Sequence, residues 1–221
     1  MRKKLHERVQ VLYEDLDVIV IEKAEGIISY PVEGSRDESA IQLIRRYWKV
    51  QGNTHKNLYL LHRLDKDTSG LLVFAKTSLA RESLLKQFEE HTVVRQYLAV
   101  TGGIPRKPKG EIHTKIGHDL RGRRAVSPHG KEAITAYEVC ARNPARERAL
   151  VACRLKTGRT HQVRIHLAYI GAPVIGDAVY GKEHQQGRLA LHAQMLGFIH
   201  PRSGLPIVFR IPLPESLKQL L

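Results

Sequence analysis

The segment LHRLDKDTSGLL at residues 61–72 places a dense run of polar side chains between apolar residues. Residues 58–61 and 71–76 have the composition of short buried strands, so the polar residues between them should form a loop. Loops that a rigid scaffold presents are frequent positions for binding and catalytic residues. This stretch therefore predicts a functional loop between two strands of a sheet, and the rest of the fold is assigned around it.

Asp65 carries the most reactive group of this loop. Arg63 and Lys66 lie within two positions of it, and nearby cations favour an ionised carboxylate that could act as a nucleophile or a base. The alternative is structural, because residues 67–70 all favour tight turns. The loop residues alone leave both interpretations open.

The pattern along the chain predicts an α+β fold with a largely antiparallel sheet, since strands dominate and regular strand–helix alternation is rare. Asp37 is expected to cap a helix that ends near Lys49, and Thr77 or Ser78 a helix that ends near His91. Residues 50–57 are expected to form a loop, residues 102–131 a long loop or two weak strands, residues 160–170 a helix, and Pro214 to begin a short one. Further strands are expected at residues 9–13, 18–22, 96–101, 133–141, 149–156 and 207–211.

A second polar segment, KTGRTHQVRIHL at residues 156–167, lies at an expected helix start. Backbone N–H groups at a helix start and arginine guanidinium groups both favour phosphates. Arg164 could instead form an ion pair with a carboxylate elsewhere, and a plain basic helix face in solvent is the structural alternative. The side chains concerned are Arg159, His161, Gln162 and Arg164.

The chain is strongly basic, with 36 Lys and Arg against 22 Asp and Glu, a net charge of +14. Residues 106–164 hold 15 of the basic and 5 of the acidic residues, a net +10, which leaves only +4 for the rest. Such a local excess favours a polyanionic partner, most simply nucleic acid, over a generic basic surface. An anionic membrane surface is disfavoured because the sequence contains no basic amphipathic helix.

Several classes of protein are excluded by what the sequence lacks. No apolar run approaches the roughly 18 residues of a membrane span, and the charged N-terminus has no apolar segment of a secretory signal behind it. We therefore expect a cytoplasmic protein whose two cysteines, Cys140 and Cys153, are reduced core thiols. His161 and His166 are five positions apart, which is poor spacing for zinc, and nucleotide-binding and hydrolase motifs are missing.

Taken together and in order, the polar segments resemble the motifs of RluA-type pseudouridine synthases. The similarity runs from about residue 11 to residue 214. It departs from the usual family pattern at Ala24, where proline is common, and at Gln96, where lysine is common. The matching segments are residues 62–71, 95–100, 158–167, 171–181, 191–193 and 198–201.

This resemblance implies a pseudouridine synthase fold, with a mixed, mostly antiparallel sheet, flanking helices and a central cleft. It implies isomerisation of uridine to pseudouridine in structured RNA, without a metal or other cofactor. No linker divides the sequence, so we expect residues 1–221 to form a single catalytic domain without an added N-terminal RNA-binding domain. The charge of residues 106–164 would then take over part of the RNA binding.

The resemblance also implies roles for individual residues. Asp65 would be the catalytic carboxylate, Tyr97 would stack on the uracil and help move the proton at C5, and Arg164 would pair with Asp65. A target uridine must leave its stack to be reached, and the Arg63 guanidinium could fill the vacated space. The other expected RNA-binding residues are His62, Arg159, His161, Gln162 and Leu191, the last as an apolar wall of the base pocket.

Two other functions remain as alternatives. One is a non-catalytic RNA-binding or ribosome-assembly factor of the same fold, against which the joint presence of Asp65, Tyr97 and Arg164 argues. The other is a hydrolase that uses Asp65 with His62, which would release a product, whereas isomerisation leaves the RNA mass unchanged. For the enzyme we expect a stem-loop of ribosomal or transfer RNA as substrate, no membrane, no obligate protein partner and a monomeric state.

Overall fold

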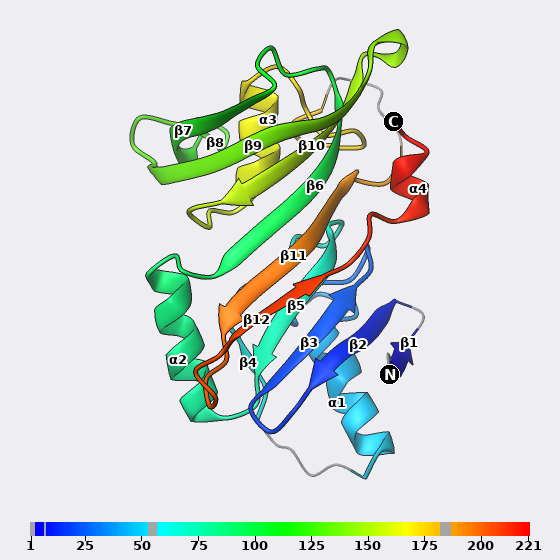
Figure 1. Cartoon of the computed structure of the whole chain (residues 1–221), viewed down its shortest axis with the longest axis vertical. Helices are drawn as coiled ribbons and strands as arrows, with labels where there is room; N and C mark the ends of the chain where they lie inside the picture. The colour runs from blue at the N-terminus through cyan, green and yellow to red at the C-terminus, as the bar shows by residue number, and fades with distance from the viewer. Residues whose placement is uncertain (1–2, 7, 53–56, 182–186) are drawn as a thin grey trace. The chain divides into compact units, whose positions relative to one another are not determined.

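The computed structural model describes residues 3–6, 8–52, 57–181 and 187–221. They form an α+β fold, in which strands are more numerous than helices and the paired strands are mostly antiparallel (Figure 1). The predicted fold class is therefore confirmed. The chain divides into two compact units, Met1–Val94 with Met195–Ile211, and Arg95–Gln194 with Pro212–Leu221.

The first unit is built on a strand meander. Its central strand β5 is buried along its whole length, which explains its almost purely apolar sequence. Two short additions complete the sheet, since β4 pairs with β5 and β12 pairs with residues 195–199 of β11. In sheet order, the meander contains β1 (Lys3–His6), β2 (Val9–Glu14), β3 (Val18–Lys23) and β5 (Ser69–Ala75). The two additions are β4 (Tyr59–Leu60) and β12 (Pro206–Arg210), and β11 spans Leu191–Ile199.

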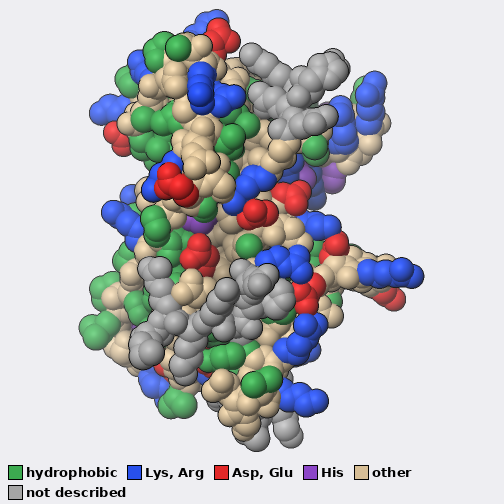
Figure 2. All heavy atoms as spheres, turned by 90° about the vertical axis from the view of Figure 1, so that its right-hand side faces the viewer, with side chains coloured by type: hydrophobic (Ala, Val, Ile, Leu, Met, Phe, Trp, Pro, Cys, Tyr) green, Lys and Arg blue, Asp and Glu red, His purple; other side chains and the backbone are tan. Residues whose placement is uncertain are grey.

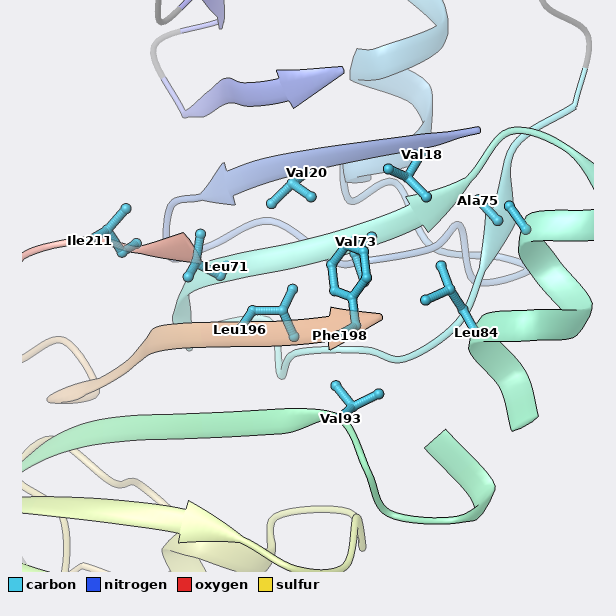
Figure 3. Packing of buried hydrophobic residues seen from close by; sticks show 11 residues of the cluster. Val18, Val20, Leu71, Val73, Ala75, Leu84, Val93, Leu196, Phe198 and Ile211 are labelled. Carbon is cyan, nitrogen blue, oxygen red and sulfur yellow. The ribbon is translucent and has the colours of Figure 1, made fainter. Parts of the chain in front are cut away.

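The core of the first unit lies on one face of these strands. Side chains from alternate positions of β3 and β5 point the same way and meet residues of β11 and helix α2 (Ser78–Glu89) (Figure 3). Burial of this cluster fixes the strands on either side of the loop at residues 61–68. Its labelled members are Val18, Val20, Leu71, Val73, Ala75, Leu84, Val93, Leu196, Phe198 and Ile211.

The helix caps confirm one prediction and correct another. Thr77 caps α2, since its side chain accepts from the Ala80 N–H, as predicted. Helix α1 (Ala40–Val50) begins later than expected, with Ser39 rather than Asp37 as the cap. Ser39 forms a reciprocal capping box with Gln42, while the Asp37 carboxylate pairs with Lys66 Nζ at 2.7 Å.

The second unit contains a longer antiparallel sheet, against which helix α3 (Gln162–Tyr169) packs on β8 and β9 (Figure 1). The turn between β9 and β10 is a 3₁₀ segment at Pro144–Arg146 that Asn143 caps, and α4 (Glu215–Lys218) follows Pro214. In sheet order, the strands are β6 (Val94–Gly102), β10 (Arg148–Leu155), β9 (Lys131–Asn143), β7 (Lys109–His118) and β8 (Arg124–Val126).

Other differences from the sequence predictions are local. Residues 102–131 contain the pair of strands, β7 and β8, rather than one long loop. Strands β1 and β11 were not predicted, and Cys140 is exposed rather than in the core, whereas Cys153 is buried. Of the expected loop at residues 50–57, residues 53–56 lie outside the described residues.

Candidate active site

The backbone around Asp65 is held from both sides by other parts of the first unit. On one side, the Leu64 N–H donates to Ser29 Oγ at 3.0 Å, and Ser29 Oγ donates to the Leu64 carbonyl at 3.0 Å. On the other side, the Lys66 carbonyl accepts from the Gly26 N–H at 2.9 Å. These bonds fix the position from which the half-buried Asp65 side chain leaves the chain.

Lys23 adds a buried cation to the same support. Its side chain is fully buried at the end of β3, so its ammonium group needs hydrogen-bond acceptors inside the protein. Three backbone carbonyls fill that need, those of Ala24 (2.9 Å), Ile27 (2.7 Å) and Lys66 (3.0 Å). Lys23 thus ties residues 24–27 to the loop that carries Asp65, and it brings a positive charge close to that loop.

His62 and Arg63 precede Asp65 in different settings. His62 is half-buried, its ring stacks on Phe88 with centroids 4.9 Å apart, and its Nε2 accepts from the Val73 N–H at 3.3 Å. These contacts anchor the start of the loop. Arg63 is exposed, which leaves a guanidinium group at the surface of the unit next to the position of Asp65.

The second unit holds Tyr97, Leu191 and Arg164. Tyr97 lies in β6 opposite Cys153 of β10 and is 8% exposed, and Leu191 begins β11 and is buried. The Arg164 guanidinium forms a bidentate pair with Asp177, with Nε–Oδ2 at 2.7 Å and Nη2–Oδ1 at 2.8 Å. This pair uses two of the five N–H donors of the guanidinium group and sets its plane.

Asp177 stays ionised in spite of its burial. Desolvation alone would raise the pKa of its carboxyl, but hydrogen bonds and the charge of Arg164 outweigh it and hold the pKa below the ordinary value. The backbone N–H groups of Val179 and Tyr180 also donate to Oδ1, at 2.9 and 3.0 Å. Arg164 is therefore oriented by a carboxylate that is itself fixed by the backbone.

Tyr180 connects Arg164 with the start of α3 and with β8. Its ring lies 5.2 Å from the Arg164 guanidinium carbon, and its hydroxyl donates to the Arg124 carbonyl at 2.9 Å. Because the single hydroxyl proton is used there, the hydroxyl must accept from His161 Nδ1, 3.0 Å away. His161, which adopts a left-handed backbone conformation with φ of 57°, thus carries a proton on Nδ1.

Gln162 and Arg159 hold the loop before α3. Gln162 is only 2% exposed, and all four of its hydrogen-bonding positions are filled, so direct contact with a ligand would require breaking these bonds. Arg159 is half-buried, and its Nε donates to the Glu132 carbonyl at 2.8 Å. The partners of Gln162 are Thr157 Oγ1, the Arg159 N–H, the Ile134 carbonyl and Thr135 Oγ1.

The predicted site residues fall into two groups by unit. The first unit contains His62, Arg63 and Asp65, and the second contains the remaining ones. The predicted pairing of Asp65 with Arg164 joins the two groups and stays a prediction. In the second group are Tyr97, Arg159, His161, Gln162, Arg164 and Leu191.

Sequence reasoning missed the residues that support these groups. Lys23 and Ser29 hold the Asp65 loop, and Asp177 and Tyr180 hold Arg164. The segment with Asp177 and Tyr180 did stand out as a motif, but their partners lie 13 to 56 positions away in sequence. The one sequence signal for Lys23 is its position next to the end of a strand-like segment, two residues after the apolar run VIVI at residues 18–21.

Basic side chains dominate the exposed charge of the protein. Figure 2 shows one face, on which Lys and Arg side chains project into solvent among Asp and Glu. Within the described part of the chain, no helix has both the length and the apolar character to cross a membrane. The exposed Lys and Arg side chains offer many cations to a polyanion.

Two solved structures share the fold of this chain. The human RNA pseudouridylate synthase domain containing 4 matches with a TM-score of 0.76 and 23% identity over 94% of this chain and 90% of that one. The human RNA pseudouridylate synthase domain containing 1 matches with a TM-score of 0.74 and 24% identity over 98% and 94%. At this level of identity the likeness concerns the fold.

Sequence comparison defines the family. Residues 17–169 match the RNA pseudouridylate synthase family, and the uncharacterized RNA pseudouridine synthase YlyB of Bacillus subtilis is 40% identical over 96% of this chain and 72% of its own length. Ribosomal large subunit pseudouridine synthase D of Zymomonas mobilis is 34% identical over 96% and 71%. The chain belongs to the RNA pseudouridylate synthase family, which confirms the resemblance. It is an RNA pseudouridine synthase, an isomerase that acts on RNA.

Proposed function

We propose that this enzyme converts specific uridines of structured ribosomal or transfer RNA to pseudouridine, with Asp65 as the catalytic carboxylate. The observation that carries the proposal is the support of the Asp65 loop. Hydrogen bonds from Ser29, Gly26 and Lys23 hold the residues on both sides of Asp65. A turn needs no such support, whereas a catalytic carboxylate needs a fixed position.

The proposed reaction needs one carboxylate held in a fixed position. The bond between C1′ and N1 of the uridine breaks, C1′ then bonds to C5, C5 loses its proton and N1 gains one, so the mass is unchanged. A carboxylate can attack the sugar or the base, or take a proton from the sugar. Each of these steps requires Asp65 to be correctly aimed, and the hydrogen bonds to Leu64 and Lys66 hold the backbone on both sides of it.

Tyr97 and Arg164 complete the proposed catalytic group. Tyr97 would stack on the uracil and assist the proton transfer at C5, while Leu191 would form an apolar wall of the base pocket. Arg164 would bridge Asp177 and Asp65, because a guanidinium group with five N–H donors can bind two carboxylates, and the bidentate pair with Asp177 fixes its plane. Asp177 would then act on the reaction through Arg164, as a positioning residue.

RNA binding would come from groups in both units. Arg63 would occupy the space that the flipped uridine leaves, and His161 could accept a hydrogen bond through Nε2 because its proton lies on Nδ1. His62, Arg159 and Gln162 would act mainly by holding the loops that face the RNA. Phosphate contacts from basic side chains would offset the few kcal/mol that base flipping costs.

The biological setting follows from this chemistry. The sequence relatives named above are bacterial proteins, and bacteria make ribosomal and transfer RNA in the cytoplasm. We therefore propose that this enzyme acts in the cytoplasm, as a monomer with residues 1–221 as one catalytic domain. Several relatives are named as ribosomal large subunit pseudouridine synthases. Large-subunit ribosomal RNA is therefore the first substrate to test.

The experiment uses unmodified transcripts of large-subunit ribosomal RNA and of transfer RNAs. Each is incubated with the enzyme, treated with a carbodiimide that marks pseudouridine, and read by primer extension. We expect stops at one or a few uridines of stem-loops, with no released uracil and no cleaved RNA. Released uracil would favour the hydrolase. Tight binding without new stops in any transcript would favour the assembly factor.

A further inference from the structure

The hairpin between β7 and β8 ends in an apolar residue that nothing in the fold covers. Leu120 has a relative exposure of 108%, the largest among the exposed large apolar residues of the described chain. The register places Gly117 opposite Ala125 and His118 opposite Arg124, so residues 119–123 form the tip. An apolar side chain in this position contributes nothing to the core.

The tip is a fixed structure. Asp119 Oδ1 accepts from the N–H groups of Arg121 and Arg123, both at 2.9 Å, and Oδ2 accepts from Arg123 Nε at 3.0 Å. The backbone closes through the Asp119 N–H and the Arg123 carbonyl at 2.7 Å, with Gly122 at a φ of 75°. Leu120 is therefore held outward by a defined turn.

Cations surround this apolar tip. Arg121 and Arg123 are exposed in the turn, and Arg124 follows at the start of β8. Tyr180 anchors the hairpin base through the Arg124 carbonyl, and the same tyrosine contacts the Arg164 guanidinium. The tip is thus joined to the residues that support the proposed catalytic group.

Protection of an edge strand explains only part of this arrangement. β8 is a short strand at the end of its sheet, and charged residues on such strands prevent unwanted pairing. A fully exposed leucine works against that purpose. The β2–β3 tip offers a comparison, because Leu16 there is 67% exposed, but the carboxylates on either side of it, Asp15 and Asp17, are already bonded to His200 and Arg202.

We propose that the β7–β8 tip is an RNA contact, in which Leu120 packs on an unstacked nucleobase while Arg121 and its neighbours contact the adjacent phosphates. Structured ribosomal and transfer RNA have unpaired bases in loops and bulges, and the faces of these bases accept apolar side chains. The inference rests on the proposed function for its partner. It adds a second recognition point, outside the segments that carry the family resemblance.

The test compares Leu120→Ser and Arg121→Gln with Leu16→Ser, the matched exposed leucine at the β2–β3 tip, where the neighbouring carboxylates are already paired. Dissociation constants are measured for two probes, the large-subunit ribosomal RNA transcript and a perfect RNA duplex without loops. Leu120→Ser should weaken transcript binding about tenfold, the effect of packing one leucine on a base, and leave duplex binding unchanged. Arg121→Gln should weaken both and lower the salt slope by about one.

Other outcomes decide against the proposal. Equal affinities of the Leu120→Ser protein, the Leu16→Ser protein and the wild type for the transcript would overturn it, as would an equal loss on both probes from Leu120→Ser. Tritium release from the C5-labelled transcript by the wild type is measured in parallel. If that release is absent while Leu120→Ser still weakens binding selectively, the proposed substrate fails and the RNA contact stands.

Discussion

Ser29 shows how a single hydroxyl can matter at a distance from the reacting atoms. It bonds both the N–H and the carbonyl of Leu64, the residue before Asp65. We expect Ser29→Ala to lower kcat roughly tenfold with little change in KM, because a loosened loop misplaces the carboxylate. Steady-state tritium release measures this. Ser35→Ala, at an exposed serine of the same segment, is the control, and an unchanged kcat in Ser29→Ala would contradict the assigned role.

The buried His166 makes the free energy of unfolding depend on pH. It is buried between Thr135 Oγ1 (2.8 Å) and Thr114 Oγ1 (3.0 Å), and burial, together with the nearby His113, lowers its pKa to about 4 from the ordinary 6.5. Burial and the Arg188 charge lower the pKa of His192 to about 4 as well. The unfolded chain therefore binds protons that the folded protein does not.

The contribution of each neutral histidine to the free energy of unfolding is fully present above pH 6.5. It is lost as the pH falls from 6.5 toward 4, by about 2 kcal/mol for each histidine at pH 4.5. Urea unfolding at pH 7 and pH 4.5 measures the loss. His166→Gln should show about half the wild-type decrease, and an undiminished decrease would mean that His166 is not held neutral.

At the scale of elements, the start of α1 shows why helix boundaries were hard to predict. Both Asp37 and Ser39 are good capping residues, but Lys66 binds the Asp37 carboxylate and the buried Ser39 caps the helix. Strand β11 was missed for a different reason, since His192, Gln194 and Gly197 interrupt its apolar pattern. Strands with regular alternation or a pure apolar run, such as β3 and β5, were predicted nearly to the residue.

The two capping candidates can be compared by mutation. Ser39→Ala removes the capping box and should lower the free energy of unfolding by about 1 kcal/mol. Asp37→Ala removes one exposed ion pair and should lower it by less than about 0.5 kcal/mol. Urea denaturation of the two variants measures both values. A larger effect at Asp37 would return the capping role to that residue.

For the whole molecule, candidate site residues were easier to propose from the sequence than the residues that support them. Asp65 and Arg164 stand in polar runs that the chain itself displays, so their chemistry could be predicted. Lys23 and Asp177 could not, because what defines them is a carbonyl or guanidinium partner that only the fold brings near. The resemblance identified the family from motif order, whereas composition alone gave no more than a polyanionic partner.

The net charge of +14 predicts strong salt dependence of RNA binding. If six or more phosphates are contacted, the affinity for the ribosomal RNA transcript should fall by about 10³-fold between 50 and 200 mM salt. Filter binding over this range gives the slope. A fall of less than about threefold would mean that the basic surface is not the main contact with RNA.

The central claim is that Asp65 is the catalytic carboxylate, and tritium release from C5 of labelled, unmodified ribosomal RNA tests it most directly. Asp65→Asn keeps the size of the side chain and removes its charge, and Asp67→Asn makes the same change two residues away on the exposed part of the loop. We predict release by the wild type and by Asp67→Asn, and none above background by Asp65→Asn. Release by Asp65→Asn at the wild-type rate would contradict the account.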